Sequence, residues 1–439
     1  MEKLQILEIL QDWNFWRKEL DTGIKRNEYL NISIRNLKSN IVLCLSGVRR
    51  AGKSYLMRQL AKKLIEDNYG KENILMINFE DQRFMKFYPG LIEEIYQTYL
   101  EFLNPSKIPF IFLDEVHNIP DWERWVRTMH ELGKAKIIVS DSSSKLLKGE
   151  FSTLLTGRHL DVTVFPLSFK EFLYFKGINI NSPLDIVSKK IEIKRFLKEY
   201  TEMGGFPEIS FSEEKKRLLM SYFEDIITKD IEKRYHIKKT EVLSSLARFY
   251  LSNISKPITF NSVRKFLNTS TVTVEKFSSY LEETNLIFFL KKFSFLVKEQ
   301  EKSAKKVYSI DPGISNSTGF RFTENFGRLM ENIVAVELER RKRSEEHTSI
   351  YYFKENEKEI DFLIKAGLNV DGLIQVCKEI NDYNVKNREL KILIKGMKKF
   401  KINNSVIITE DYEAQEKIGS KRIIDYIPLW RYLLTSEGS

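Results

Sequence analysis

The feature that most constrains this chain is one run of eight residues, Gly47-Val48-Arg49-Arg50-Ala51-Gly52-Lys53-Ser54. It fits the phosphate-binding pattern G-x-x-x-x-G-K-[ST] at every fixed position. The apolar stretch over residues 41–46 predicts a buried strand before it, and the apolar period of residues 55–64 predicts a helix after it. A chance match in a loop is the alternative, and these flanking elements disfavour it. The run therefore predicts a phosphate site at a helix N-terminus.

Each fixed position of the run has a physical role. Gly47 and Gly52 permit the tight turn and the close approach of phosphate oxygens. Lys53 can reach the β- and γ-phosphates of a nucleotide, and the Ser54 hydroxyl can ligate Mg²⁺. The predicted nucleotide-binding residues are Gly47, Val48, Arg49, Arg50, Ala51, Gly52, Lys53, Ser54 and Tyr55.

A second motif is the apolar stretch over residues 108–113, which ends in Asp114 and Glu115. A nucleotide site needs an acid that holds Mg²⁺ and a base that orients the attacking water, and we assign these roles to Asp114 and Glu115. The alternative is a strand that ends in a charged turn. Because Mg²⁺ takes only one or two protein ligands and keeps several waters, Ser54 and Asp114 suffice as the metal site.

The composition sets wider limits. A chain of 439 residues is long enough for two to four domains, and 42% hydrophobic residues can build their cores. The apolar runs are too short to span a bilayer, the N-terminus lacks the core of a signal peptide, and only Cys44 and Cys377 are present, both in apolar runs. We therefore expect buried free thiols and a cytoplasmic protein. The net charge of +10 permits an anionic partner.

Apolar strands and amphipathic helices alternate over residues 40–175, which predicts an α/β fold with a mostly parallel sheet covered on both faces. The predicted strands are Ile41–Ser46, Ile74–Phe79, Phe110–Asp114, Lys136–Ser140 and Val162–Phe165. Two helices followed by two strand-like runs within residues 241–310 outline a winged helix. A second α/β segment covers residues 320–430.

Several motifs together resemble a known family. They are GVRRAGKS, ILMINFED, LDEVHNIPDWERWVR, SDSSSKLL, LLTGRHL, FPLSFKEFL and GGFPE. The chain resembles archaeal and bacterial ATPases of the AAA+/STAND-like P-loop superfamily that end in a restriction-endonuclease-like domain. The resemblance implies an ATPase domain over residues 1–175 with a helical lead-in, a helical lid over 176–240, a winged helix over 241–315 and a nuclease-like domain over 316–439.

The resemblance assigns further residues to the site. Arg158, in a T-G-R motif, is expected to act as an arginine finger in cis or from a neighbouring subunit, with a surface salt bridge as the alternative. Ser142 or Ser143 is expected to sense the γ-phosphate, with helix capping as the alternative. Weaker candidates are Arg49, Arg50, Lys25, Arg26, Glu80, Asp81, His117 and Asn118.

The C-terminal segment departs from the nuclease pattern. Such nucleases hold Mg²⁺ with an acid on one strand and an E-x-K motif on the next, often with a glutamate from a helix. Glu331 and Asp361 match the helix glutamate and the first acid, but Gln375 and Cys377 replace the glutamate and the lysine of E-x-K. Lys378 falls one residue late, on the opposite face of the strand. We therefore expect no DNA cleavage.

These observations predict an ATPase that uses ATP and Mg²⁺ and serves as a molecular switch or motor, with Lys53, Glu115 and Arg158 as catalytic residues. DNA is the favoured partner, contacted by a basic loop from Lys298 to Lys306, and self-association is a further expectation. Two alternatives stay open. One is a signalling or scaffold protein that binds ATP and another protein, and the other is an active ATP-dependent nuclease.

Overall fold

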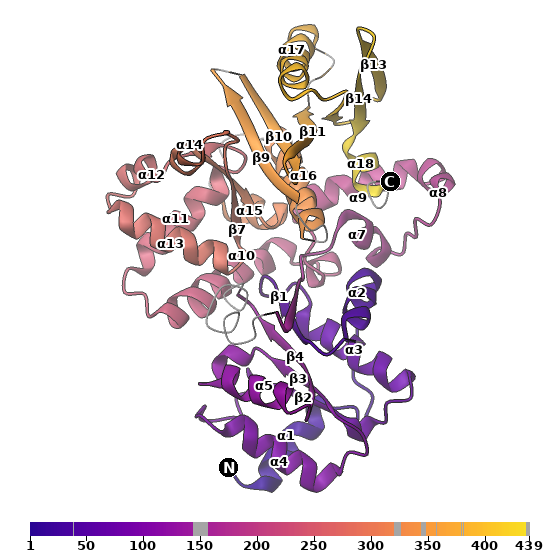
Figure 1. Cartoon of the computed structure of the whole chain (residues 1–439), viewed down its shortest axis with the longest axis vertical. Helices are drawn as coiled ribbons and strands as arrows, with labels where there is room; N and C mark the ends of the chain where they lie inside the picture. Colours follow the sequence, from indigo (N-terminus) through magenta and orange to yellow (C-terminus); the bar gives the residue numbers. More distant parts are fainter. Residues whose placement is uncertain are drawn as a thin grey trace. The chain divides into compact units, whose positions relative to one another are not determined.

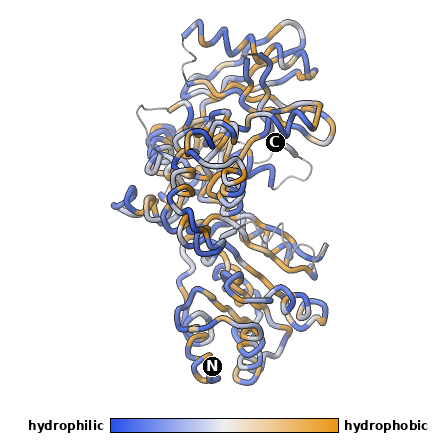
Figure 2. The backbone as a smooth tube through the Cα atoms, turned by 90° about the vertical axis from the view of Figure 1, so that its left-hand side faces the viewer, coloured by the Kyte–Doolittle hydropathy of each residue, from blue (hydrophilic) through white to orange (hydrophobic). Residues whose placement is uncertain are grey.

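A computed structural model describes residues 1–37, 39–143, 157–319, 326–343, 348–356, 358–378, 380 and 382–435. The chain divides into two compact units, Met1–Val164 and Phe165–Ser439 (Figure 1). Hydrophobic and hydrophilic residues are intermixed along the helices (Figure 2), as expected of helices with one buried face. Among the described residues, no helix is long and apolar enough to cross a membrane. Cys44 and Cys377 are buried free thiols, which confirms the expectation from sequence.

The first unit is built on a five-stranded sheet in the order β2-β3-β4-β1-β5. Its strands are β1 (Val42–Ser46), β2 (Ile74–Asn78), β3 (Phe110–Asp114), β4 (Lys136–Asp141) and β5 (His159–Thr163). Every neighbouring pair is parallel. Because Ser46 is in register with Asp141 and Asn78 with Asp114, the carboxyl ends of these strands meet at one edge of the sheet.

Helices cover this sheet. They are α1 (Lys3–Trp13), α2 (Asn27–Leu37), α3 (Lys53–Glu66), α4 (Leu91–Leu103) and α5 (Trp122–Glu131). Alternate strand residues such as Val42, Cys44 and Leu113 share one apolar core with buried residues of α1, α4 and α5. The intervening residues Leu43 and Leu45 are buried as well. Strands buried on both faces explain the continuous apolar runs in the sequence.

The fifth strand, His159–Thr163, begins three residues and ends two residues earlier than the predicted strand Val162–Phe165. It pairs with β1 from Val42↔His159 to Ser46↔Thr163. The sequence hid this strand because it lies at the sheet edge, where His159, Asp161 and Thr163 are polar and the apolar run is broken. The backbone groups of β1 still need partners, and they fix the strand where its sequence pattern is weak.

The second unit begins with helices. They are α7 (Phe169–Phe175), α8 (Pro183–Ser188), α9 (Lys190–Met203), α10 (Lys215–Asp225), a π-helix (Ile226–Lys233) and α11 (Thr240–Ser252). Ser168 caps α7 with a full capping box, in which its side chain accepts from the Glu171 N–H and the Glu171 side chain accepts from the Ser168 N–H.

A small three-stranded sheet follows, in the order β6-β8-β7. Its elements are β6 (Pro257–Ile258), α12 (Phe260–Phe266), α13 (Thr271–Glu283), β7 (Ile287–Leu290), α14 (Val297–Lys302) and β8 (Lys305–Ser309), followed by α15 (Pro312–Thr318). Both strand pairs are antiparallel. Two helices followed by an antiparallel pair match the order expected over 241–310. The predicted basic loop is largely the short helix α14.

The rest of the second unit is a six-stranded mixed sheet in the order β13-β14-β12-β11-β10-β9. Its elements are α16 (Phe326–Lys342), β9 (Thr348–Glu355), β10 (Lys358–Ala366), β11 (Asn369–Cys377), α17 (Tyr383–Phe400), β12 (Asn404–Thr409), β13 (Ala414–Ile418), β14 (Arg422–Pro428) and α18 (Leu429–Thr435). Of the predicted nuclease-like site, α16 carries Glu331, β10 carries Asp361, and β11 carries Gln375 and Cys377. The last three elements were not anticipated from the sequence.

Candidate nucleotide site

The predicted phosphate-binding run connects β1 to α3 at the carboxyl edge of the parallel sheet. Gly52 is the N-cap of α3 with φ 99°, and Gly47 has φ 145°. A Cβ on Gly47 would lie 2.2 Å from the carbonyl oxygen of Val164. Both positions therefore need glycine. Gly52 needs it for its positive φ, and Gly47 needs it both for its positive φ and because a Cβ would clash with the Val164 carbonyl oxygen.

The Lys53 ammonium lies inside this turn. Its Nζ donates to the carbonyl oxygen of Gly47 at 2.9 Å and lies 3.6 Å from Glu115 Oε1. The side chain is only 4% exposed. A buried ammonium that contacts a carbonyl and a carboxylate is a strong attractor for an anionic group that enters the turn.

The acid pair follows β3 at the same edge. Ser140 Oγ, on β4, donates to Asp114 Oδ1 and accepts from the Glu115 N–H at 3.0 Å. Ser54 and Asp114 line one small cavity. A hydroxyl and a carboxylate are ligands that suit Mg²⁺, so the residues present fit this ion.

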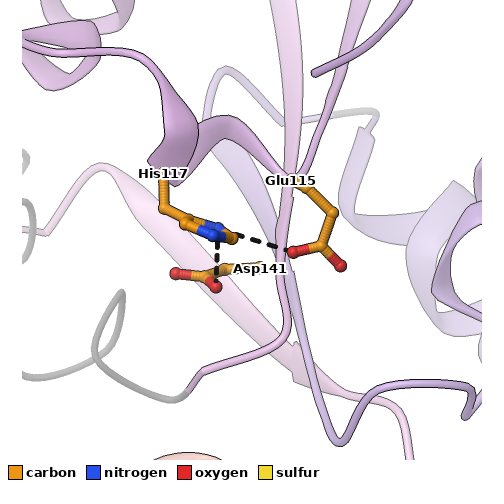
Figure 3. A group of neighbouring side chains, drawn as sticks. All are labelled: Glu115, His117 and Asp141. Carbon is orange, nitrogen blue, oxygen red and sulfur yellow. Dashed lines mark ion pairs between the residues drawn. The ribbon is translucent and has the colours of Figure 1, made fainter. Parts of the chain in front are cut away.

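Glu115 lies beside His117, which also contacts Asp141 (Figure 3). Its Oε2 lies 3.4 Å from His117 Nδ1 and accepts from the Ser142 N–H at 3.2 Å. His117 Nδ1 also lies 3.1 Å from Asp141 Oδ1. Burial raises the pKa of Glu115, as do the charges of Asp141 and Asp114, although Lys53 and His117 oppose them. A base with a raised pKa is better matched to proton transfer near neutral pH.

Asp141 is the residue that the sequence reasoning missed. The polar residue at the end of β4 was expected to be Ser142 or Ser143, but the side chain that reaches His117 belongs to Asp141. Its position as the last residue of a parallel strand is the signal that could have identified it. Ser142 contributes its backbone N–H to Glu115, and a γ-phosphate role for Ser142 or Ser143 stays a prediction.

Basic residues around the turn have acidic or carbonyl partners. Arg49 donates to Glu80 Oε1 at 2.6 Å. Arg26 is buried, and its guanidinium donates to the Ala51 carbonyl oxygen at 2.9 Å. Arg26 therefore stabilises the backbone of the turn and does not face solvent. Lys25 is exposed.

Arg158 lies elsewhere in the first unit. It precedes β5, and its carbonyl oxygen accepts from the Val42 N–H at the amino end of β1. Strand β1 extends from Val42 to Ser46, a length of about 13 Å at roughly 3.3 Å per residue. The Arg158 backbone therefore lies about 13 Å from the start of the phosphate-binding turn. Its guanidinium pairs with Glu131 at 3.0 Å and is 55% exposed. This position disfavours a role in cis and leaves the neighbouring-subunit role as a prediction.

The acids of the C-terminal segment also converge, but around a lysine. Lys306 Nζ lies 2.9 Å from Glu331 Oε1 and 2.9 Å from Asp361 Oδ1. Lys306 is thus buried, and its expected role as a DNA-binding loop residue is wrong. Lys298 and Lys302 are exposed as expected.

The two residues in place of E-x-K are buried. Gln375 Nε2 donates to Glu389 Oε2 at 2.9 Å, and Gln375 Oε1 accepts from the Asp361 N–H at 3.2 Å. Cys377 belongs to the apolar core under α17. Lys378 is exposed and lies over the Phe326 ring at 5.6 Å. No lysine of β11 therefore reaches the two acids.

Sequence comparisons assign three segments to families. Residues 39–173 match an AAA domain, residues 194–324 match the domain of unknown function DUF8612, and residues 326–432 match the domain of unknown function DUF4143. The uncharacterized protein MJ1544 of Methanocaldococcus jannaschii is 33% identical over 425 residues, which cover 94% of this chain and 92% of the relative. An uncharacterized protein of Haemophilus influenzae is 29% identical over 415 residues, which cover 93% and 98%.

Solved structures with a related fold have low identity. The ORC1 protein of Aeropyrum pernix in complex with DNA is 11% identical with a TM-score of 0.32, covering 72% of this chain and 96% of that one. A STAND protein with a tetratricopeptide repeat sensor from Pyrococcus horikoshii is 14% identical with a TM-score of 0.25, covering 73% and 46%.

Proposed function

We propose that this chain binds and hydrolyses ATP with Mg²⁺ and acts as a switch or motor on DNA. The chain belongs to the family of the uncharacterized protein MJ1544 of Methanocaldococcus jannaschii and carries an AAA domain. The observation that carries the proposal is the convergence of Lys53, Asp114 and Glu115 at one edge of a parallel sheet. Nucleotides bind at this edge in open α/β sheets.

Each residue of the proposed nucleotide site has a separate role in phosphoryl transfer. Lys53 and the backbone N–H groups of the turn bind the phosphates. Ser54 and Asp114 would hold Mg²⁺, which neutralises phosphate charge when it is bound. Glu115 accepts a proton from the attacking water, and the Ser142 N–H and the Lys53 ammonium hold its carboxylate in place. Arg158 contributes from a neighbouring subunit, which requires self-association.

The finer parts of the proposal concern the second unit and the place of action. Residues 241–315 form a winged helix that contacts DNA through the exposed lysines of α14. Residues 316–439 form a nuclease-like domain that does not cut. The net charge of +10 is compatible with DNA as an anionic partner, and we place the activity in the cytoplasm.

The site assignment is tested with Lys53→Ala. We expect loss of binding of a fluorescent ATP analogue, because the replacement removes the buried ammonium from the turn. Lys63→Ala is the matched control, since Lys63 lies on the same helix, is partly exposed and pairs only at the surface with Asp67. Equal binding by both variants would contradict the site.

The partner is tested with the ATPase rate of the full chain. We expect double-stranded DNA to raise the rate and Lys53→Ala to abolish it with and without DNA. A measurable ATPase rate that no DNA changes would favour the scaffold alternative, in which a second protein is the partner.

A further inference from the structure

One lysine and three carboxylates form a compact centre in the second unit. Lys306 comes from β8 of the three-stranded sheet, Glu331 from α16, and Glu359 and Asp361 from β10 of the six-stranded sheet. Lys306 Nζ lies 2.9 Å from Glu331 Oε1, 2.7 Å from Glu359 Oε1 and 2.9 Å from Asp361 Oδ1. The ammonium group donates hydrogen bonds to Glu331 and Asp361, and it forms an ion pair with Glu359.

The centre is closed to solvent on the lysine side. The Lys306 side chain is 1% exposed, against 9% for Asp361 and 13% for Glu331. Tyr308 donates to Glu331 Oε1 at 2.7 Å, and the Val376 N–H donates to Asp361 Oδ2 at 3.0 Å. A buried ammonium without partners is very costly, so its position depends on these carboxylates.

The charges at the centre are not balanced. The formal charges of three ionised carboxylates and one ammonium group sum to −2. A fourth carboxylate, that of Glu389, is separated from the centre by the Gln375 side chain. Burial raises the pKa of Glu331, and the charge of Asp361 raises it further. Burial alone would lower the pKa of Lys306, but Asp361 and Glu331 raise it overall, so the lysine stays charged. Such a set of oxygens attracts a cation, and the ammonium already stands at its middle.

We propose that Lys306 is the resident cation of this centre. Its ammonium group occupies the position in which the three carboxylates would otherwise hold a divalent metal ion. Through these ion pairs, Lys306 also links the three-stranded sheet to the six-stranded sheet. A metal bound by the same oxygens would lie 2.0 to 2.6 Å from them, a space that the ammonium fills. Gln375 fits the same arrangement, because its neutral amide accepts from the Asp361 backbone N–H and donates to the Glu389 carboxylate without adding another negative charge. The residues present therefore do not fit a resident metal.

The test uses the full chain without nucleotide and Mn²⁺ as the probe, with free Mn²⁺ followed by electron paramagnetic resonance. The wild-type chain and Asp361→Asn should give the same isotherm, because no wild-type Mn²⁺ site depends on Asp361. Lys306→Ala should gain one site with a dissociation constant on the order of 10⁻⁴ to 10⁻³ M, and Lys306→Ala with Asp361→Asn should lose it. Lys305→Ala is the matched control, since Lys305 adjoins Lys306 on β8 with its side chain on the other face.

The thermal unfolding midpoint gives a second readout. Lys306→Ala should lower it by at least several degrees, Mn²⁺ should restore part of the loss, and Lys305→Ala should leave it near the wild-type value. If Lys306→Ala lacks a folded near-ultraviolet circular dichroism spectrum, millimolar Mn²⁺ should restore it. A wild-type Mn²⁺ site that disappears in Asp361→Asn would overturn the proposal. Failure of Lys306→Ala to gain a site, or to refold with Mn²⁺, would overturn it as well.

Discussion

Glu115 stands in a backbone conformation that few residues adopt. Its φ is 51°, in the left-handed region, and its carboxylate is nearly buried between Lys53 and His117. A left-handed non-glycine residue costs roughly 1–3 kcal/mol and persists only where its surroundings hold it. Here the Ser140 hydroxyl binds the Glu115 N–H, so β4 fixes the turn that aims the carboxylate.

The role of this carboxylate is tested by Glu115→Gln. The amide keeps the shape of the side chain but cannot accept a proton, so turnover should fall on the order of 10²-fold or more while ATP binding is retained. Single-turnover hydrolysis and equilibrium binding of ATP measure the two effects. Glu101→Gln, at an exposed position of α4, should change neither. Normal turnover by Glu115→Gln would assign the base to another residue.

At the scale of elements, the segment after α9 is held by a single buried carboxylate. Asp311 Oδ2 accepts from the Gly205 N–H at 2.6 Å, and Oδ1 accepts from the N–H groups of Gly313 and Ile314 at 2.8 and 3.1 Å. A Cβ on Gly204 would lie 1.9 Å from Asp311 Oδ1. Gly204 is therefore required by the approach of this carboxylate as well as by its φ of 77°. Gly205 is required by the backbone of Leu167, because a Cβ there would lie 2.4 Å from the Leu167 carbonyl oxygen.

Asp311 makes stability depend on pH. Burial raises its pKa to about 6 from an ordinary value of 3.8, although its three backbone N–H donors oppose the shift. A folded-state pKa above the unfolded one means that its stabilising contribution is complete below pH 3.8 and is lost as the pH rises through 6. Asp311→Asn lacks this ionisation. Its free energy of unfolding, minus that of the wild type, should therefore grow by about 2 kcal/mol between pH 4 and pH 7. Urea denaturation at each pH measures it, and a constant difference would contradict it.

The lysines of α14 are the exposed part of the predicted DNA contact. If Lys298 and Lys302 each neutralise one phosphate, replacing both by alanine should weaken DNA binding and reduce the slope of log affinity against log salt by about 2. Fluorescence anisotropy with a labelled duplex at several salt concentrations measures the slope. Lys86→Ala, at an exposed position of the first unit, is the control. An unchanged slope in the double variant would leave α14 without a role in DNA binding.

At the scale of the whole molecule, the two compact units carry different chemistry. The first contains the proposed nucleotide site, and the second contains a carboxylate centre closed by Lys306. Developing charge on a phosphate needs a metal ion or a free ammonium group, and this centre offers neither to solvent.

The full chain should therefore leave supercoiled and linear DNA intact with Mg²⁺ or Mn²⁺, with and without ATP. Agarose gel electrophoresis over several hours is the measurement, with a metal-dependent nuclease as the positive control. Asp361→Ala separates contamination from intrinsic activity. Cleavage that disappears in this variant would promote the nuclease alternative.

Local pattern was sufficient for much of the fold. The strands β1 to β4 lie within one residue of their predicted bounds at each end, because both faces are buried and their apolar runs are continuous. The final strands β13 and β14 were missed because β13 has no buried residue, β14 buries only alternate residues, and no strong apolar run marks either strand. An edge strand such as β5 is set by the backbone groups of its neighbour as much as by its own side chains.

The sequence by itself determined the phosphate-binding turn and the acid pair. The fixed positions of the turn and the strand that ends in Asp114 and Glu115 are local patterns, and carboxyl ends of parallel strands share an edge. Only the tertiary structure decided that Asp141 joins Glu115 through His117, and that Lys306 enters an acidic centre. Lys306 meets Glu331 and Asp361 across 25 and 55 residues of sequence, and nothing in its local pattern separates it from the exposed Lys302. The physical reason is that burial of a charge depends on partners, and only the folded chain brings those partners together.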